Sequence, residues 1–232
     1  IISHHRIWED YANNLYEADL KMRFSDYKGA YQLRNNLSIP LNTSSQYNRI
    51  VSTIYDYDLN QLDLVYSTLD SLKSIKKLNK IEFAEVIVSL IQDIPYTLIL
   101  TDDCNADNYN DTFIEEYLAD KGDCQGFTKY GLLTPVEFVS TLKGDCDTRT
   151  LLLFTIFNHY NYDVVMLSSE LYKHSIIGIN LPYQGISKSI NGIKYIVWET
   201  TNKGIPPGII SREISDMRFW NVSLKSNKNL SI

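Results

Sequence analysis

The spacing of apolar and polar residues changes along the chain, and each change predicts a different element. Apolar and polar residues alternate over 16–24, which predicts a strand. Turn-forming residues dominate 35–48, which predicts a loop. Apolar residues then recur every three or four positions over 57–78 and again over about 80–92. This spacing predicts two helices, the second ended by Pro95.

A strong helix-start signal precedes the longest apolar run. Thr134 can cap a helix, Pro135 suits its first position, and Glu137 can close a capping box. Gly144 is suited to end this helix in a left-handed conformation. The apolar run that follows predicts a second, mostly buried helix beginning at Cys146. We therefore expect the cysteine at the junction of two helices.

Runs of β-branched and aromatic residues, separated by polar turns, follow the buried helix. They predict strands over 163–167, 174–181 and 193–200. We expect these strands to form an antiparallel sheet packed behind the helix that begins at Cys146, with an additional strand and further helices in the N-terminal part. The predicted fold class is α+β.

The composition fits one compact unit. The chain has 232 residues, of which 44% are hydrophobic and 22% are charged, which is enough for a sizeable core. We assign residues 1–56 to an N-terminal extension and residues 57–232 to the main domain, and we expect both to form one body. The chain begins with Ile1 rather than Met, so we expect a processed segment whose leader or membrane tether lies outside it.

The charge of the chain argues against one class of partner. The formal net charge is −6, and the only basic cluster, at 73–77, fits the solvated face of a helix. An acidic chain has no electrostatic attraction for phosphate backbones, so we expect no nucleic-acid partner.

Three cysteines occur, at positions 104, 124 and 146, and none belongs to a C-x-x-C pair, which argues against a structural zinc site. Cys104 and Cys124 enclose residues 105–123, and the sequence leaves open whether they are free thiols or a disulfide. A disulfide would leave Cys146 alone and would imply an oxidising compartment. We expect the two cysteines to lie close enough to bridge, in a periplasmic, secreted or membrane-tethered protein.

One acidic stretch resembles the start of a calcium loop. Its D-x-N-x-D pattern places four oxygen-bearing side chains at Asp103, Asn105, Asp107 and Asp111. The sixth loop position holds Asn108 instead of glycine, and the twelfth holds Ile114 instead of a bidentate glutamate. A polar surface loop is the favoured interpretation, and we expect no metal ion or other cofactor in the chemistry.

Cys146 has a context that suits a nucleophile. The positive end of a helix dipole and its unpaired N–H groups favour a thiolate, whereas the flanking Asp145 and Asp147 disfavour it. Of the four histidines, only His174 at the start of a strand is free to fold over this helix end. A third group must hold the imidazole in one tautomer, and the next strand offers Glu199.

Three segments together resemble the transglutaminase-like superfamily, whose fold is related to that of papain-like cysteine proteases. They are LTPVEFVSTLKGDCDTRTLLL, YKHSIIGINLP and YIVWETT, and the upstream IQDIPY is similar to a stretch often found in bacterial members. The resemblance covers about residues 80–201. It implies that Cys146 is the nucleophile, that His174 is the acid and base, and that Glu199 orients His174. The family usually has aspartate where Glu199 stands.

The resemblance implies a thiol-dependent acyl-transfer enzyme that attacks an amide bond of a protein or peptide through a Cys146 thioester. Hydrolysis, as in a cysteine peptidase or amidase, is slightly favoured over transfer to an amine. Gln92 is either an oxyanion donor, as in papain-like sites, or a solvated glutamine at a helix end. The alternative function is a binding or scaffolding domain that keeps this fold without turnover. A reactive thiol of low pKa would favour the enzyme, and an inert one the binding domain.

Overall fold

The computed structural model describes residues 1–40 and 46–226, and these form an α+β fold. The helices are α1 (Phe24–Asn36), α2 (Gln46–Asp58), α3 (Asp63–Lys76), α4 (Lys80–Asp93), α5 (Thr112–Ala119), α6 (Pro135–Thr141) and α7 (Cys146–His159). The strands are β1 (Ile2–Glu9), β2 (Leu15–Met22), β3 (Leu98–Ile99), β4 (Cys124–Gln125), β5 (Val164–Ser169), β6 (His174–Ile179), β7 (Ser187–Ile190), β8 (Ile193–Trp198) and β9 (Asn221–Lys225).

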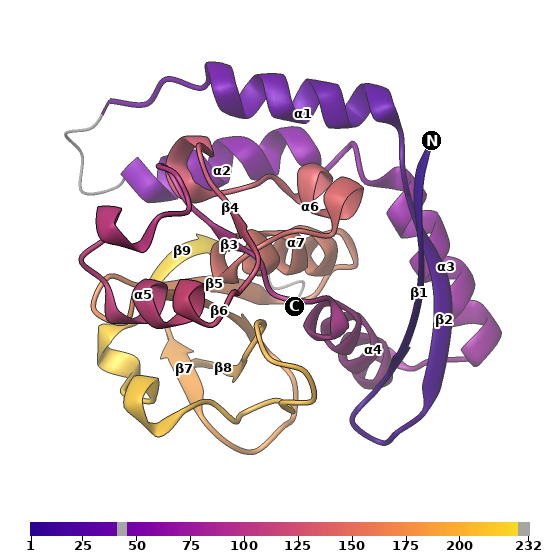
Figure 1. The fold of residues 1–232 in the computed structure, drawn as a ribbon. Helices are drawn as coiled ribbons and strands as arrows, with labels where there is room; N and C mark the ends of the chain where they lie inside the picture. Colours follow the sequence, from indigo (N-terminus) through magenta and orange to yellow (C-terminus); the bar gives the residue numbers. More distant parts are fainter. Residues whose placement is uncertain (41–45, 227–232) are drawn as a thin grey trace.

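The main sheet is antiparallel, has the order β7-β8-β6-β5-β9, and packs one face against α7 (Figure 1). Its central strands are buried on both faces. Met166 of β5 joins the large core together with residues of α7, whereas the neighbouring Leu167 joins a second cluster with Trp220. Because successive side chains of a strand point to opposite faces, a sheet covered on both sides produces continuous apolar runs.

The N-terminal part shares the core of the rest of the chain. The β1–β2 hairpin packs against α3 and α4 (Figure 1), and the indole of Trp8 donates a hydrogen bond to the carbonyl of Val86 at 3.2 Å. One continuous hydrophobic cluster includes Trp8 of β1 and Trp198 of β8. The boundary expected after residue 56 falls inside α2. In the described part of the chain, no helix is both long and apolar enough to cross a lipid bilayer.

Three predicted elements differ from the observed ones. The helix expected over 57–78 is divided, because α2 ends at Asp58 and α3 begins at Asp63. The strand expected over 16–24 ends at Met22, and Phe24 already begins α1. The loop expected over 35–48 is shorter, since it lies between α1 and α2, and its residues 41–45 lie outside the described residues.

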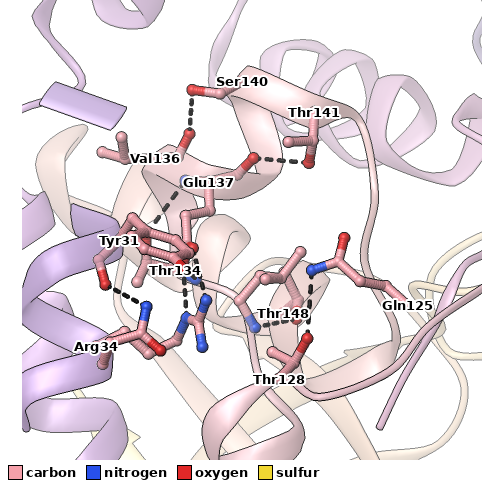
Figure 2. Close-up of polar contacts among 12 residues, drawn as sticks. Tyr31, Arg34, Gln125, Thr128, Thr134, Val136, Glu137, Ser140, Thr141 and Thr148 are labelled. Carbon is pink, nitrogen blue, oxygen red and sulfur yellow. Dashed lines mark hydrogen bonds and ion pairs between the residues drawn. The ribbon is translucent and has the colours of Figure 1, made fainter. Parts of the chain in front are cut away.

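Helix α6 begins as the sequence predicts, and an ion pair supports its first turn. The Thr134 hydroxyl accepts from the backbone N–H of Glu137, whose carboxylate accepts from the backbone N–H of Thr134, so the capping box is complete. Figure 2 shows Arg34 of α1 beside this carboxylate, to which it donates two hydrogen bonds of 2.8 Å. The segment just before α6 also contacts α7, because the Thr148 hydroxyl of α7 accepts a hydrogen bond from the backbone N–H of Leu133 (Figure 2).

The predicted end of α6 is wrong in its detail. The left-handed residue at the C-terminus is Leu142, with φ 54°, rather than Gly144. Gly144 is required for a different reason, because a Cβ atom there would lie 2.5 Å from the ring of Phe138. The glycine therefore permits close packing of the segment that leads into α7.

Asp58 is a buried carboxyl group that joins α2 to α6. Its side chain is 0% exposed and accepts a hydrogen bond of 2.8 Å from the backbone N–H of Val136 in the first turn of α6. Burial raises the pKa of Asp58 to about 7. The folded protein therefore holds a proton here that the unfolded chain releases at much lower pH.

We expect Asp58 to make folding less favourable as the pH rises. Its stabilising contribution is present below the unfolded pKa of about 3.9 and is lost as the pH rises to about 7, with a slope approaching about 1.4 kcal/mol per pH unit. Asp58→Asn keeps the acceptor oxygen but removes the titration. The free energy of unfolding in urea, measured between these pH values, should fall less steeply in this variant. The control is Asp56→Asn, at an exposed position of the same helix. Equal slopes in wild type and Asp58→Asn would contradict the assignment.

Candidate active site

Cys146 is the first residue of α7, and the residue before it caps the helix. The Asp145 side chain accepts a hydrogen bond of 3.1 Å from the backbone N–H of Thr148, which satisfies one of the free donors of the first turn. The cysteine is 8% exposed and is the free thiol of the described residues. The chain therefore presents the sulfur at a fixed helix terminus that is nearly closed to solvent.

His174 and Glu199 lie at the same end of two neighbouring interior strands of the main sheet. His174 begins β6 and Glu199 directly follows β8, and these two strands are antiparallel neighbours. The imidazole Nε2 lies 3.2 and 3.1 Å from the two carboxylate oxygens of Glu199. Because a carboxylate accepts, Nε2 carries the proton in the neutral ring, and Nδ1 is left as the free acceptor.

The carboxylate of Glu199 is held by more than the histidine. Its Oε1 accepts from the backbone N–H groups of Thr200 and Thr201 and from the Thr201 hydroxyl, at 2.8, 3.0 and 2.8 Å. Burial alone would raise the pKa of Glu199, but the hydrogen bonds from His174 and Thr201 outweigh it and lower the pKa to about 2. Glu199 is therefore ionised at neutral pH and is suited to orient an imidazole and balance its charge.

A cavity of about 570 Å³ brings the three predicted residues together, because Cys146, His174 and Glu199 all line it. Aromatic side chains cover much of the remaining wall, and they are Tyr96, Phe113, Tyr117 and Tyr172. A cavity of this size, with an apolar wall and a few polar groups at one place, is typical of a small-molecule or side-chain binding site.

A disulfide closes the segment that carries part of this wall. Cys104 and Cys124 are bonded, with their Cα atoms 6.1 Å apart, and helix α5 lies between them. The segment is also attached to the rest of the protein by the parallel pair β3–β4 and by an ion pair of 2.5 Å between Asp111 and Lys173. Lys173 directly precedes His174, so this ion pair places α5 beside the candidate site.

The thiol is not activated in the resting structure. Burial, followed by the charges of Asp147 and Asp145, raises the pKa of Cys146 well above its usual value, although a backbone hydrogen bond with Ser175 lowers it in part. The helix terminus therefore does not produce a thiolate, contrary to what its dipole alone would favour. Asp145 is itself affected, since burial and the neighbouring Asp147 raise its pKa to about 8. Near neutral pH the sulfur carries its proton.

Gln92 is not an oxyanion donor in this structure. Its amide nitrogen donates to the carbonyls of Glu199 and Ile205 at 2.7 and 2.9 Å, and its oxygen accepts from the Tyr11 hydroxyl. The side chain is 2% exposed, so the solvated alternative is wrong as well. Gln92 instead holds the backbone of Glu199, whose carboxylate contacts His174.

The residues of the calcium-loop pattern make local contacts instead of a cage. Asp103 accepts from Asn105 and Asn108, and Asp111 caps α5 while it pairs with Lys173. Over residues 1–40 and 46–226, no three His, Cys, Asp or Glu side chains gather closely enough to hold a metal ion.

Arg149 is an organising residue that the sequence reasoning did not recognise. Its buried guanidinium donates to five backbone carbonyls at 2.7 to 3.3 Å, which are those of Ile91, Ile94, Pro95, Gly144 and Thr200. Burial lowers its pKa to about 10, so it remains charged at neutral pH. The available signal was a charged residue one turn inside a helix that is otherwise apolar. Arg149 joins the end of α4, the start of α7 and the segment after β8.

We expect Cys146 to react slowly with iodoacetamide at neutral pH. The raised pKa leaves little thiolate, and burial restricts access, so Cys146 should be alkylated more slowly than a cysteine peptide. Its alkylation rate should also keep rising with pH beyond the pH at which the rate of the peptide levels off. Mass spectrometry under non-reducing conditions would follow the reaction, with the same protein in urea as the control. Alkylation of the folded protein at the peptide's rate would contradict the buried, protonated thiol.

Replacement of Arg149 by lysine should destabilise the fold although it keeps the charge. An ammonium group has three donors on one nitrogen and leaves several buried carbonyls without partners, so we expect a loss of about 3–5 kcal/mol. Urea unfolding would measure it against Arg49→Lys, a change at an exposed position of α2. A loss no larger than that of the control would show that Arg149 does not hold these segments together.

Known proteins add nothing to this geometry. No family model, curated protein or solved structure matches the chain. Because a fold by itself does not define a function, the function must be argued from the residues of the site and their arrangement.

Proposed function

We propose that this chain is a thiol-dependent acyl-transfer enzyme of the transglutaminase-like kind, with Cys146 as the nucleophile. The observation that carries the proposal is the convergence of Cys146, His174 and Glu199 on one cavity, with His174 bonded to Glu199 through Nε2. The resemblance of the three sequence segments to that superfamily agrees with this order of helix start, strand start and strand end. The substrate is an amide of a peptide or protein.

The chemistry follows from a thiol that is protonated at rest. As the sulfur attacks the amide carbonyl, Nδ1 of His174 accepts the thiol proton, so proton transfer accompanies the attack. The C–N bond of the tetrahedral intermediate then breaks, His174 returns the proton to the leaving amine, and a thioester remains on Cys146. Glu199, which is ionised, balances the imidazolium charge. Gln92 takes no part in binding the oxyanion, and the unpaired N–H groups of the first turn of α7 fill that role.

The wall of the cavity favours a substrate with a bulky apolar group on the acyl side. Tyr96, Phe113 and Tyr117 line this space, and the ring of Tyr96 contacts the other two edge to face. Aromatic walls bind apolar side chains better than the short polar chain of glutamine. This preference supports hydrolysis over transfer from glutamine to an amine. The disulfide supports an oxidising, extracytoplasmic compartment.

A binding domain without turnover is the second candidate. The observation in its favour is the thiol, which is buried, protonated and flanked by two aspartates. Such a cysteine is inert unless substrate and His174 act on it together. The reactivity of the thiol, which the sequence offered as the discriminator, no longer separates the two functions, because a buried, protonated thiol agrees with both. The measurement that separates them is substrate turnover.

Incubation with a mixed peptide library, followed by mass spectrometry of new termini and of amine incorporation, tests the enzyme directly. Cys146→Ala should abolish product formation, and His174→Ala should reduce it by about 10³-fold or more. Glu199→Gln should be milder, because it still contacts the ring but no longer balances its charge. Glu199→Asp tests the departure from the usual family residue.

The matched control is His5→Ala, at an exposed position of β1. Product that persists in Cys146→Ala would rule out the thioester. A wild-type protein that binds peptides from the library but converts none would favour the binding domain.

A further inference from the structure

A hydrogen-bonded triangle lies directly behind the candidate reacting pair. Asp147 follows Cys146 in α7, and Ser175 follows His174 in β6. Oδ1 of Asp147 accepts a hydrogen bond of 2.7 Å from the Tyr47 hydroxyl and a further one from the Ser175 hydroxyl. The two hydroxyl oxygens lie 3.3 Å apart, which completes the triangle.

The triangle connects three elements that are distant in sequence. Tyr47 belongs to α2, in the part of the chain outside the family resemblance, whereas Asp147 and Ser175 flank the reacting groups. Ser175 is fully buried, and its backbone is one of the groups that act on the pKa of the Cys146 thiol, which it lowers in part. A shift of α7 relative to β6 would therefore break the contact between the Ser175 hydroxyl and Asp147.

We propose that Asp147, held by the hydroxyls of Tyr47 and Ser175, is a positioning residue that sets the separation between the Cys146 sulfur and the His174 imidazole. The proposal rests on the proposed function, and it gives the N-terminal part of the chain a role at the site. It goes beyond the assignment of Cys146, His174 and Glu199, because the distance between sulfur and imidazole is set by side chains that do not contact the substrate.

The need for such positioning follows from the state of the thiol. A preformed thiolate can react over a range of geometries, but a protonated thiol must pass its proton to Nδ1 during the attack. Small displacements of the donor from the acceptor then reduce the rate steeply. The charge of Asp147 makes the thiolate less favourable, so the same residue that opposes ionisation also holds the partners together.

Several groups face this sulfur and must be considered in any pH profile. They come from every element packed around it, and they are Tyr47, Tyr96, Asp145, Asp147, Arg149, His174 and Glu199. The decisive quantity is therefore a ratio, in which the contributions of the unchanged groups cancel. We define the His174 effect as the rate of a variant divided by the rate of the same variant with His174→Ala added.

The test is acylation of Cys146 by p-nitrophenyl acetate in single turnover, followed by the mass of the intact protein at several pH values. This activated ester needs no knowledge of the natural substrate. In wild type the His174 effect should be large. Tyr47→Phe and Ser175→Ala should each lower it by about tenfold, and Asp147→Ala by up to about a hundredfold. The control Tyr55→Phe removes a hydroxyl from the same helix that contacts Asn158 instead, and should leave the effect unchanged.

Asp147→Asn separates geometry from charge. It keeps an acceptor oxygen for the two hydroxyls, so most of the His174 effect should return relative to Asp147→Ala. It also removes the charge beside the sulfur, so the pH midpoint of Cys146 alkylation should move downward. A merely structural residue would not produce this combination of rescue and shifted profile.

The outcomes separate this proposal from the proposed function. If Tyr47→Phe and Asp147→Ala keep the wild-type His174 effect, or lower the rate equally with and without His174, the positioning role is overturned even when peptides are converted. If the variants lose the effect but no peptide is converted, the positioning role holds and the enzyme assignment fails. A wild type without any His174 effect would overturn both.

Discussion

The arrangement of the site depends on one buried cation. Arg149 is buried, no carboxylate among residues 1–40 and 46–226 pairs with it, and five backbone carbonyls share its charge. An isolated buried charge is costly, so these carbonyls must stay where the guanidinium can reach them. They belong to the end of α4, to the residue before the α7 cap and to the segment after β8. The positions of Cys146 and Glu199 are therefore fixed by the same side chain.

The fold was predictable where burial determines the pattern. The strands β5, β6 and β8 are covered on both faces, so their sequences are continuously apolar and were assigned. The edge strands β7 and β9 are short and carry Lys188 and Lys225, so they lack that pattern and were missed. The apolar spacing over 57–78 did not reveal the break between α2 and α3. Asp58, the last residue of α2, instead accepts a hydrogen bond from the start of α6. Such a tertiary contact leaves no local periodic signal.

The sequence predicted which residues form the candidate site, but it did not predict their ionisation. Few histidines and one strand-end carboxylate left little choice for the partners of Cys146, and the structure brings all three to one cavity. The sequence left the ionisation of the thiol open between the helix dipole and the flanking aspartates, because the burial of the sulfur, which raises its pKa most, appears only in three dimensions. Gln92 was misjudged for a similar reason, since its carbonyl partners lie more than a hundred residues away. The hydrogen-bond partners of buried polar side chains are often distant in sequence, so the local sequence does not reveal them.

The disulfide-closed segment has a consequence for how this protein could diversify. Residues 105–123 supply Phe113 and Tyr117 to the cavity, yet the sulfur, the imidazole and the carboxylate all come from other parts of the chain. The segment is anchored at its base by a covalent cross-link and by the β3–β4 pair. Insertions or substitutions within it can therefore reshape the cavity wall while Cys146, His174 and Glu199 keep their places. Under the proposed function, selection can act on substrate choice and on reactivity as two separate traits.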